Sequence, residues 1–437
     1  MIRLERWTLD PETLDAPHAL AARARALAPD ATSVAADVAA ILADVRARGE
    51  EAVLELTRRF DTAGDEPDPL RVDAEELEEA AGELDPDLRA ALDRATTNVG
   101  TVAEAALGAP EDRDVLLPEG HVVRLRHVPV RSAAVYVPGG RAPYPSTVVM
   151  GVVCARVAGV ERIVVCSPPG RGGADPAILA ASSLCGADEV YRMGGAQAIA
   201  ALAYGTSSVP AVDVIVGPGN LYVQEAKRQL ADRVGIDGFA GPSDLLVLAA
   251  EDADPRLVAL DLLAQAEHGP QSLVAVASPE PDVLDEVAAQ LAALAPARPT
   301  ANPAAALLVD VWDAEAALAF AEALAPEHLE LVGAELEALA ARVRAAGCVF
   351  VGANGATAFG DYVAGSNHVL PTGGAARFAS ALSPQHFRRR IAEVRIDDGA
   401  VASLARAGAT IARAEGFVVH AESMEARASL RDNGSIQ

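Results

Sequence analysis

Short apolar strands alternate with helices from residue 133 onward, and this alternation limits the fold more than any other feature of the sequence. The first four strands are expected at 133–137, 162–166, 189–192 and 212–216, each followed by a helix. Further strands are expected at 245–249, 273–277, 306–309 and 349–351. Continuous apolar strands of this kind are typical of parallel sheets that helices cover on both faces. The sequence therefore predicts an α/β protein with two parallel-sheet domains.

A helical segment precedes these domains. Apolar residues recur every three or four positions, which predicts helices at 34–48, 51–60, 74–83 and 87–101. We expect these helices to join the second sheet, so that residues 133–242 form an inserted domain. The predicted organisation is an N-terminal arm at 1–25, a discontinuous first domain at 26–132 with 243–381, a second domain at 133–242, and a C-terminal dimerisation module at 382–437.

The charge of the chain excludes several classes of function. The 437 residues carry a formal net charge of -26, which disfavours binding to nucleic acid or to an anionic membrane surface. Lys227 is the only lysine, so the chain has no G-K-[ST] phosphate loop. We expect Lys227 to lie on an exposed helix, where it would be a poor Schiff-base nucleophile.

Cysteine usage and the N-terminus indicate where the protein is located. The four cysteines are widely spaced, contain no CxxC motif, and are interpreted as small buried apolar residues. The first residues carry charges where a signal peptide needs an apolar stretch, and no apolar run reaches 18 residues. The sequence therefore predicts a cytoplasmic protein.

One helix end carries residues that suit a metal ion. Gln265 and His268 lie one turn apart on the helix that stops at Gly269. An amide oxygen and an imidazole nitrogen at this spacing can reach one zinc ion. A histidine at a helix C-terminus is equally favoured by the helix dipole alone.

Three further segments offer acids and histidines. Glu327 and His328 are adjacent near a helix end, where irregular backbone could direct both into one cleft as an acid–base pair. A surface Glu–His pair is the alternative interpretation. Asp361 and His368 occupy a glycine-flanked segment that could equally be an ordinary loop. Glu415 and His420, in the C-terminal module, could lie on a solvated helix face.

The residues alone do not indicate a dinucleotide. Gly217-Pro-Gly-Asn220 follows a predicted strand and opens a helix whose N-terminus could hold an anion, but no complete GxGxxG fingerprint occurs in the chain. The residues by themselves indicate an α/β enzyme that can bind zinc and that carries a His/Glu acid–base set.

Taken together, eight segments resemble the histidinol dehydrogenase family, in the right order and over nearly the whole chain. They lie at 49–61, 137–146, 192–201, 217–220, 240–243, 265–268, 325–330 and 360–372. The resemblance implies two incomplete Rossmann-like domains and a zinc- and NAD-dependent oxidation of L-histidinol to L-histidine through the aldehyde. Asp244, Cys154, Leu324 and Phe417 depart from the family pattern, and none of them is a proposed ligand or base.

The resemblance also implies roles for individual residues. One zinc ion per subunit would be held by Gln265, His268, Asp361 and His420. The acid–base pair would be Glu327 and His328. The substrate would contact all six of these residues together with Ser243, His368 and Glu415. NAD⁺ would contact Tyr136, Gln197 and Asn220. The family pattern further implies a homodimer in which Glu415 and His420 complete the site of the partner.

Two alternative functions remain open. A related zinc- and NAD-dependent enzyme could oxidise another small polar alcohol, although the presence of Ser243, His368 and Glu415 favours histidinol. A zinc hydrolase could instead use Glu327 to activate water, and it would produce no NADH.

Overall fold

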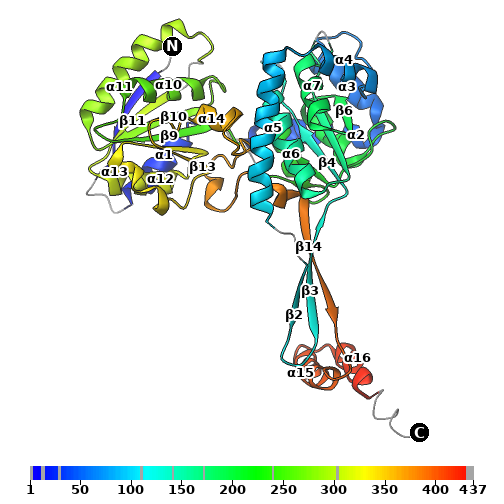
Figure 1. Cartoon of the computed structure of the whole chain (residues 1–437). Helices are drawn as coiled ribbons and strands as arrows, with labels where there is room; N and C mark the ends of the chain where they lie inside the picture. Colours follow the sequence, from blue (N-terminus) through cyan, green and yellow to red (C-terminus); the bar gives the residue numbers. More distant parts are fainter. Residues whose placement is uncertain are drawn as a thin grey trace. The chain divides into compact units, whose positions relative to one another are not determined.

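The computed structural model describes residues 3–10, 15–27, 31–108, 112–139, 142–170, 173–238, 241–301 and 305–429. Two segments of the family resemblance include residues outside this description, at 140–141 and at 240, as does the end of the C-terminal module at 430–437. The chain divides into two compact units (Figure 1). The first unit is Met1–Leu107 with Val130–Phe387, and the second is Gly108–Pro129 with Arg388–Gln437.

The first unit contains a six-stranded sheet in which every neighbouring pair of strands is parallel. Its order is β1-β11-β10-β9-β12-β13. The strands are β1 (Arg3–Thr8), β9 (Asp244–Ala249), β10 (Leu273–Ser278), β11 (Ala305–Asp310), β12 (His328–Val332) and β13 (Cys348–Val351). One face is covered by α1 (Ala16–Arg25), α12 (Ala314–Leu324) and α13 (Ala334–Glu337), and the other by α10 (Pro255–Ala266) and α11 (Pro281–Leu294). The short helix α14 (Thr357–Tyr362) packs against α10.

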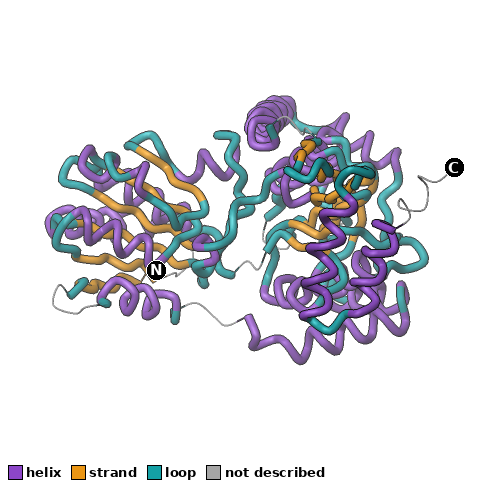
Figure 2. Tube along the Cα trace, turned by 90° about the horizontal axis from the view of Figure 1, so that it is seen from below, coloured by secondary structure: helices purple, strands orange, loops and turns teal. Residues whose placement is uncertain are grey.

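The same unit contains a five-stranded parallel sheet with the order β6-β5-β4-β7-β8. Its strands are β4 (Ser132–Tyr136), β5 (Arg162–Ser167), β6 (Glu189–Arg192), β7 (Val214–Val216) and β8 (Gly235–Ile236). One face packs on α5 (Pro86–Leu107), α6 (Pro145–Ala158) and α7 (Pro176–Cys185). The other packs on α2 (Ala35–Arg48), α3 (Glu50–Phe60), α8 (Gly195–Tyr204) and α9 (Leu221–Gln229), while α4 (Ala74–Glu83) lies on α7. Figure 2 shows the strands lying between helices.

The second unit is an antiparallel three-stranded sheet and a pair of helices. The strands β2 (Arg113–Leu116), β3 (Val122–Pro129) and β14 (Arg388–Arg395) pair in the order β14-β3-β2. The helices α15 (Val401–Ala414) and α16 (Val418–Ser429) pack together through alanines and Met424. No helix in the described part of the chain is long and apolar enough to cross a membrane. The predicted fold class, two parallel-sheet α/β domains with a helical segment and a small C-terminal module, is confirmed.

The predicted placement of the early helices is wrong. Helices α2 to α5 pack on the five-stranded sheet, whereas the sequence analysis placed them on the six-stranded sheet. Their periodicity shows which face is apolar, but it carries no information about which sheet that face covers. The N-terminal strand β1 is what joins the six-stranded sheet, at its edge beside β11. The domain boundaries drawn from the sequence stay a prediction.

The predicted exposure of Lys227 is also wrong. The Lys227 side chain is only 1% exposed, and its ammonium group donates to the carbonyl oxygen of Gly217 at 3.0 Å and to the carboxylate of Asp237. Asp237 also accepts from the Gly217 N–H at 2.7 Å. The ion pair therefore holds the turn after β7, which gives the chain's only lysine a structural role.

Three of the cysteines behave as the sequence predicts. Cys154, Cys166 and Cys185 are free and buried, and Cys348 is free and half-buried. Burial raises the pKa of the Cys154 and Cys185 thiols to about 11. These thiols are therefore protonated and unreactive near neutral pH.

Candidate active site

A cluster of polar residues gathers at the amino ends of β9 and β12. Ser243 directly precedes β9, Glu327 directly precedes β12, and His328 is the first residue of β12. His328 pairs in register with Leu245 of β9. Gln265 lies in the last turn of α10, and its side chain reaches Ser243. Open parallel sheets more commonly bind ligands at the carboxyl ends of their strands. The cluster in this sheet lies at the opposite, amino ends.

The carboxylate of Glu327 is fixed by neighbouring donors. Its Oε2 accepts from the Ser243 hydroxyl and from the Asp244 N–H at 3.0 Å. The Ser243 hydroxyl in turn accepts from Gln265 Nε2 at 2.5 Å. The Glu327 N–H donates to Asp244 Oδ1 at 2.7 Å. Glu327 is therefore a buried carboxylate with a single defined orientation.

A strained turn directs Glu327 into this cluster. Ala325 ends α12 with φ at 45°, in the left-handed region that costs a non-glycine residue roughly 1–2 kcal/mol. After the turn, the Cys348 N–H donates to the Glu327 carbonyl oxygen at 2.9 Å. A Cβ atom on Gly347 would lie 2.5 Å from that carbonyl oxygen, so only glycine allows this approach. Backbone strain of this kind is found where a side chain has to be aimed at a site.

His328 lies between two carboxylates. Its Nδ1 is 3.6 Å from Glu327 Oε2, and its Nε2 is 3.7 Å from Asp361 Oδ1. Burial lowers the pKa of His328, but the negative charges of Glu327 and Asp361 outweigh burial and raise it to about 9. Burial raises the pKa of Asp361, but His328 outweighs burial and brings it below its usual value. The sequence analysis placed Glu327 and His328 on irregular backbone, whereas His328 opens a buried strand.

His368 is held by hydrogen bonds to residues of two helices, α14 and α6. Its Nδ1 lies 2.8 Å from the Asp361 carbonyl oxygen, and its Nε2 lies 3.1 Å from the Thr147 hydroxyl of α6. Burial lowers the pKa of His368, which keeps the ring neutral. Because a carbonyl oxygen only accepts, Nδ1 carries the proton and Nε2 accepts from Thr147. Thr147 was missed by the sequence analysis, since nothing in its local sequence indicates a contact 221 residues away.

Residues expected to bind zinc lie around this cluster. Gln265 Oε1 is buried and has no hydrogen-bond partner, although Gln265 Nε2 is engaged by Ser243. An unpaired buried amide oxygen is costly unless a ligand completes it. His268 Nδ1 lies 3.3 Å from the Gln265 carbonyl oxygen, and His268 is close enough to Asp361 to lower the pKa of that carboxyl. Asp361 lies on the helix α14 instead of the predicted loop.

The donor set in the first unit is incomplete for zinc. Within the described ranges, no group of three or more His, Cys, Asp or Glu side chains is arranged to hold a metal ion. Gln265, His268 and Asp361 supply an amide oxygen, an imidazole and a carboxylate, which is one ligand fewer than a tetrahedral site needs. The C-terminal end of α10 also favours a positive charge at this position. These residues fit a zinc ion that takes a further ligand from elsewhere.

Glu415 and His420 belong to the second unit. Glu415 caps the C-terminus of α15, and His420 is the third residue of α16. Both side chains are exposed, and the ring of His420 lies 5.3 Å from that of Phe417.

The residues expected to bind NAD⁺ lie at the carboxyl edge of the five-stranded sheet. Tyr136 ends β4, and its hydroxyl accepts from the Gly195 N–H at 3.1 Å, at the start of α8. Gln197 lies in the first turn of α8 and donates to Asp61 Oδ2 at 3.3 Å. Asn220 caps α9 by accepting from the Tyr222 N–H at 3.0 Å. This edge is where open α/β sheets bind nucleotides.

Asp61 is a second residue that the sequence analysis missed. It caps the C-terminus of α3, and burial raises its pKa to about 6. A buried carboxyl group with a raised pKa beside the start of α8 marks this position as a candidate functional residue. The only sequence signal was its place at the end of the 49–61 segment.

Comparison with known proteins identifies the family. A sequence model described as histidinol dehydrogenase matches residues 25–428. The histidinol dehydrogenase of Parasynechococcus marenigrum (strain WH8102) is 44% identical over 392 residues, which cover 88% of this chain and 89% of that protein. The histidinol dehydrogenase of Natronomonas pharaonis is 44% identical over 391 residues, which cover 87% of this chain and 90% of that protein.

A solved structure agrees with the sequence comparisons. The crystal structure of histidinol dehydrogenase from Elizabethkingia anophelis matches with a TM-score of 0.87 at 29% identity, and the match covers 99% of each chain. The sequence match and the shared fold both extend over almost all of the chain, so the chain belongs to the histidinol dehydrogenase family of oxidoreductases.

Proposed function

We propose that this chain oxidises L-histidinol to L-histidine, the last step of histidine biosynthesis, with two NAD⁺ used in succession. The observation that carries the proposal is the buried Glu327 carboxylate, fixed by Ser243 and the Asp244 N–H beside His328. One histidinol, two NAD⁺ and one water give one histidine, two NADH and three protons. A cytoplasmic location suits such a biosynthetic enzyme.

The two residues of the acid–base pair have different tasks. His328 in its neutral form takes the proton of the alcohol while the first hydride leaves the carbinol carbon. Because Glu327 and Asp361 raise the pKa of His328 to about 9, the neutral form and the rate of this step increase as the pH rises toward 9. Glu327 then takes a proton from water, the water oxygen bonds to the aldehyde carbon, and protonated His328 returns its proton to the former carbonyl oxygen to form a hydrate. A second hydride leaves the hydrate while His328 takes the proton of one hydroxyl group, which gives the acid. General base catalysis of each step contributes roughly 10²–10⁴-fold in rate.

The cofactors have identifiable residues in the chain. Gln265, His268, Asp361 and His420 would hold zinc, and the unpaired Gln265 Oε1 supports this assignment. When bound, zinc supplies a positive charge that orients the nitrogen atoms of the substrate. Tyr136, Gln197 and Asn220 would contact NAD⁺, the hydride acceptor. Ser243, His368 and Glu415 would contact the substrate.

Glu415 and His420 of one subunit would complete the site in the other subunit of a homodimer. A complementation experiment tests this arrangement. Glu327→Gln and His420→Ala subunits are each expected to be inactive, but a heterodimer of the two contains one site with neither substitution. Random reassociation of equal amounts should restore about a quarter of the wild-type activity. No recovery in confirmed heterodimers would refute the shared site.

The function is tested by following NADH absorbance with L-histidinol and NAD⁺, before and after the metal is stripped and zinc restored. We expect NADH formation that chelation abolishes and zinc recovers. NADH formation only with another alcohol would favour the related alcohol dehydrogenase. Ester or amide cleavage without NADH would favour the zinc hydrolase.

A further inference from the structure

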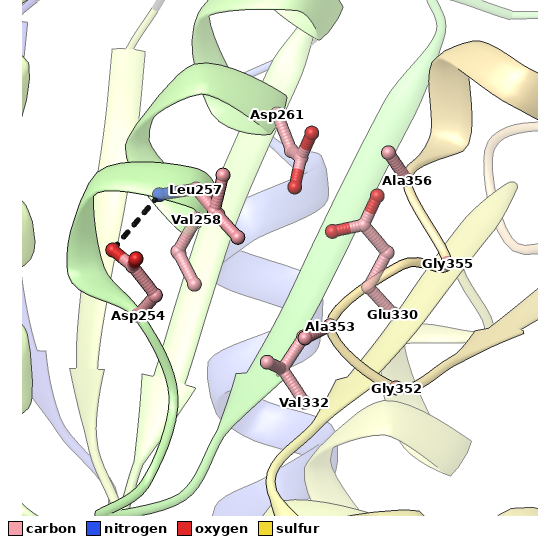
Figure 3. A pocket seen from close by; sticks show the side chains of 10 residues that line it. All are labelled: Asp254, Leu257, Val258, Asp261, Glu330, Val332, Gly352, Ala353, Gly355 and Ala356. Carbon is pink, nitrogen blue, oxygen red and sulfur yellow. Dashed lines mark hydrogen bonds between the residues drawn. The ribbon is translucent and has the colours of Figure 1, made fainter.

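A second pair of buried acids lies in the six-stranded sheet, outside the cluster described above. Asp261 of α10 and Glu330 of β12 face each other across a small cavity, and their carboxyl groups point toward one another (Figure 3). The cavity of ≈ 10 Å³ has room for about one water molecule and is also lined by Val258, Val332 and the loop 352–356. No role for either acid follows from the mechanism proposed above.

The hydrogen bonds of Glu330 leave one oxygen without a donor. Thr357 donates to Glu330 Oε1 through its N–H at 2.8 Å and through its hydroxyl at 2.5 Å. Glu330 Oε2 is fully buried, and no backbone N–H, hydroxyl, amide or cationic group of the described residues donates to it. The side chains of Asp261 and Glu330 are within hydrogen-bonding reach of each other, and Oε2 is the Glu330 oxygen that no other group engages. Two ionised carboxylates cannot form that bond, because each only accepts.

No cationic side chain lines the cavity between the two acids. The residues that line the cavity include no lysine, arginine or histidine, and the third acid there, Asp254, accepts from the first backbone N–H groups of α10. His328, two residues earlier in β12, also acts on Glu330, and its positive charge lowers the pKa of that carboxyl group without outweighing burial. Burial raises the pKa of both carboxyl groups, and Glu330 raises that of Asp261 further. A single proton on Asp261, donated to Glu330 Oε2, therefore satisfies both groups.

The positions of the two acids connect them to the active site. Asp261 lies four residues before Gln265, on the same face of α10. Glu330 lies two residues after His328, on the same face of β12. A bond between Asp261 and Glu330 therefore joins the helix that carries Gln265 to the strand that carries His328. We propose that Asp261 and Glu330 share one proton, and that this hydrogen bond positions Gln265 and His328 relative to each other. The positioning role rests on the functions proposed above for Gln265 and His328, whereas the shared proton does not.

Three variants test the proposal. In Asp261→Asn, the amide N–H₂ group replaces the proton as donor to Glu330 Oε2, so kcat should stay within about threefold of the wild type. In Glu330→Gln, the amide can donate to ionised Asp261 and still accept from Thr357, so the same result is expected. Asp261→Leu keeps the same branched arrangement of side-chain heavy atoms but supplies no donor, and kcat should fall at least tenfold. Equal losses in Asp261→Asn and Asp261→Leu would refute the positioning role.

The pH dependence of unfolding measures the shared proton independently of catalysis. Because the pKa of Asp261 is raised in the folded state, the folded wild type holds a proton that the unfolded chain has released above about pH 4. The unfolding constant of the wild type should therefore rise by up to tenfold more per pH unit than that of Asp261→Asn between pH 5 and 7. Parallel pH profiles would refute the shared proton even in an active enzyme. A wild type that forms no NADH with histidinol would refute the proposed function and leave this measurement valid.

Discussion

Replacing Ser243 with alanine tests how the site is held together. The Ser243 hydroxyl donates to Glu327 Oε2 and accepts from Gln265 Nε2, so one atom orients both the base and the amide. As long as Nε2 is engaged by Ser243, Gln265 Oε1 is the atom left to bind zinc. Without the hydroxyl, the amide of Gln265 can rotate, and Glu327 keeps only the Asp244 N–H as a donor.

The magnitude follows from the two lost hydrogen bonds. One of them involves a charged carboxylate and is worth roughly 1.5–3 kcal/mol, while the neutral one is worth roughly 0.5–1.5 kcal/mol. Their sum sets an upper limit of about 4.5 kcal/mol on the loss of unfolding free energy. Because Ser243 also orients a proposed metal ligand, zinc affinity should fall about 10–100-fold.

The assay combines zinc competition against a chromophoric chelator with initial rates of NADH formation. Ser182→Ala is the control, because the Ser182 hydroxyl is buried outside the cluster and donates to the Ile178 carbonyl oxygen of its own helix, at 2.7 Å. The control should keep wild-type zinc affinity. A Ser243→Ala enzyme with unchanged zinc affinity and unchanged turnover would refute the orienting role.

Three other substitutions give distinct outcomes. Asp61→Asn removes a carboxyl group whose pKa burial raises to about 6, so the wild type should lose roughly 2 kcal/mol of unfolding free energy as the pH rises from 4 to 6 that the variant does not lose; equal pH profiles in denaturant titrations would contradict this. Replacing Cys154, Cys166, Cys185 and Cys348 with alanine should leave NADH formation largely intact: Cys348 pairs with His328 in the neighbouring strand, but burial raises the pKa of its thiol and disfavours the nucleophilic thiolate; a selective loss of the second oxidation would overturn that view. Ala325→Gly relieves a left-handed conformation that costs roughly 1–2 kcal/mol but adds roughly 0.5–1 kcal/mol of chain entropy, so the melting temperature should rise slightly, and a clear fall would show that the turn is not strained.

The apolar strands were predictable from the sequence, but strands that carry polar residues were not. The continuous apolar runs at 245–249 and 273–277 lie in β9 and β10, as expected. The strand β12 was missed because His328 and Glu330 occupy one of its faces, and β1 was missed because only Trp7 of this edge strand is buried. The antiparallel strands of the second unit were missed because half-exposed, charged strands have no apolar run.

In the candidate site, too, residues close together in the sequence were predictable, whereas contacts between distant segments were not. The spacing of Gln265 and His268 predicted a ligand pair at one helix end, and the structure places Gln265 beside Ser243 and His268 near Asp361. The contact of Thr147 with His368 depends on packing between distant segments, as does the bond between Asp261 and Glu330. Periodicity and spacing describe one segment at a time, so contacts of this kind need the folded chain.

The most direct test of the proposed mechanism counts NADH formed per L-histidinol when the substrate is limiting, in the wild type and in Glu327→Gln. The wild type should form two NADH per histidinol. The variant keeps His328 for the first hydride transfer but lacks the base that activates water, so its steady-state rate of histidine formation should fall roughly 10²–10⁴-fold. One NADH per histidinol in the wild type, or histidine formation at the wild-type rate in the variant, would contradict the proposed mechanism.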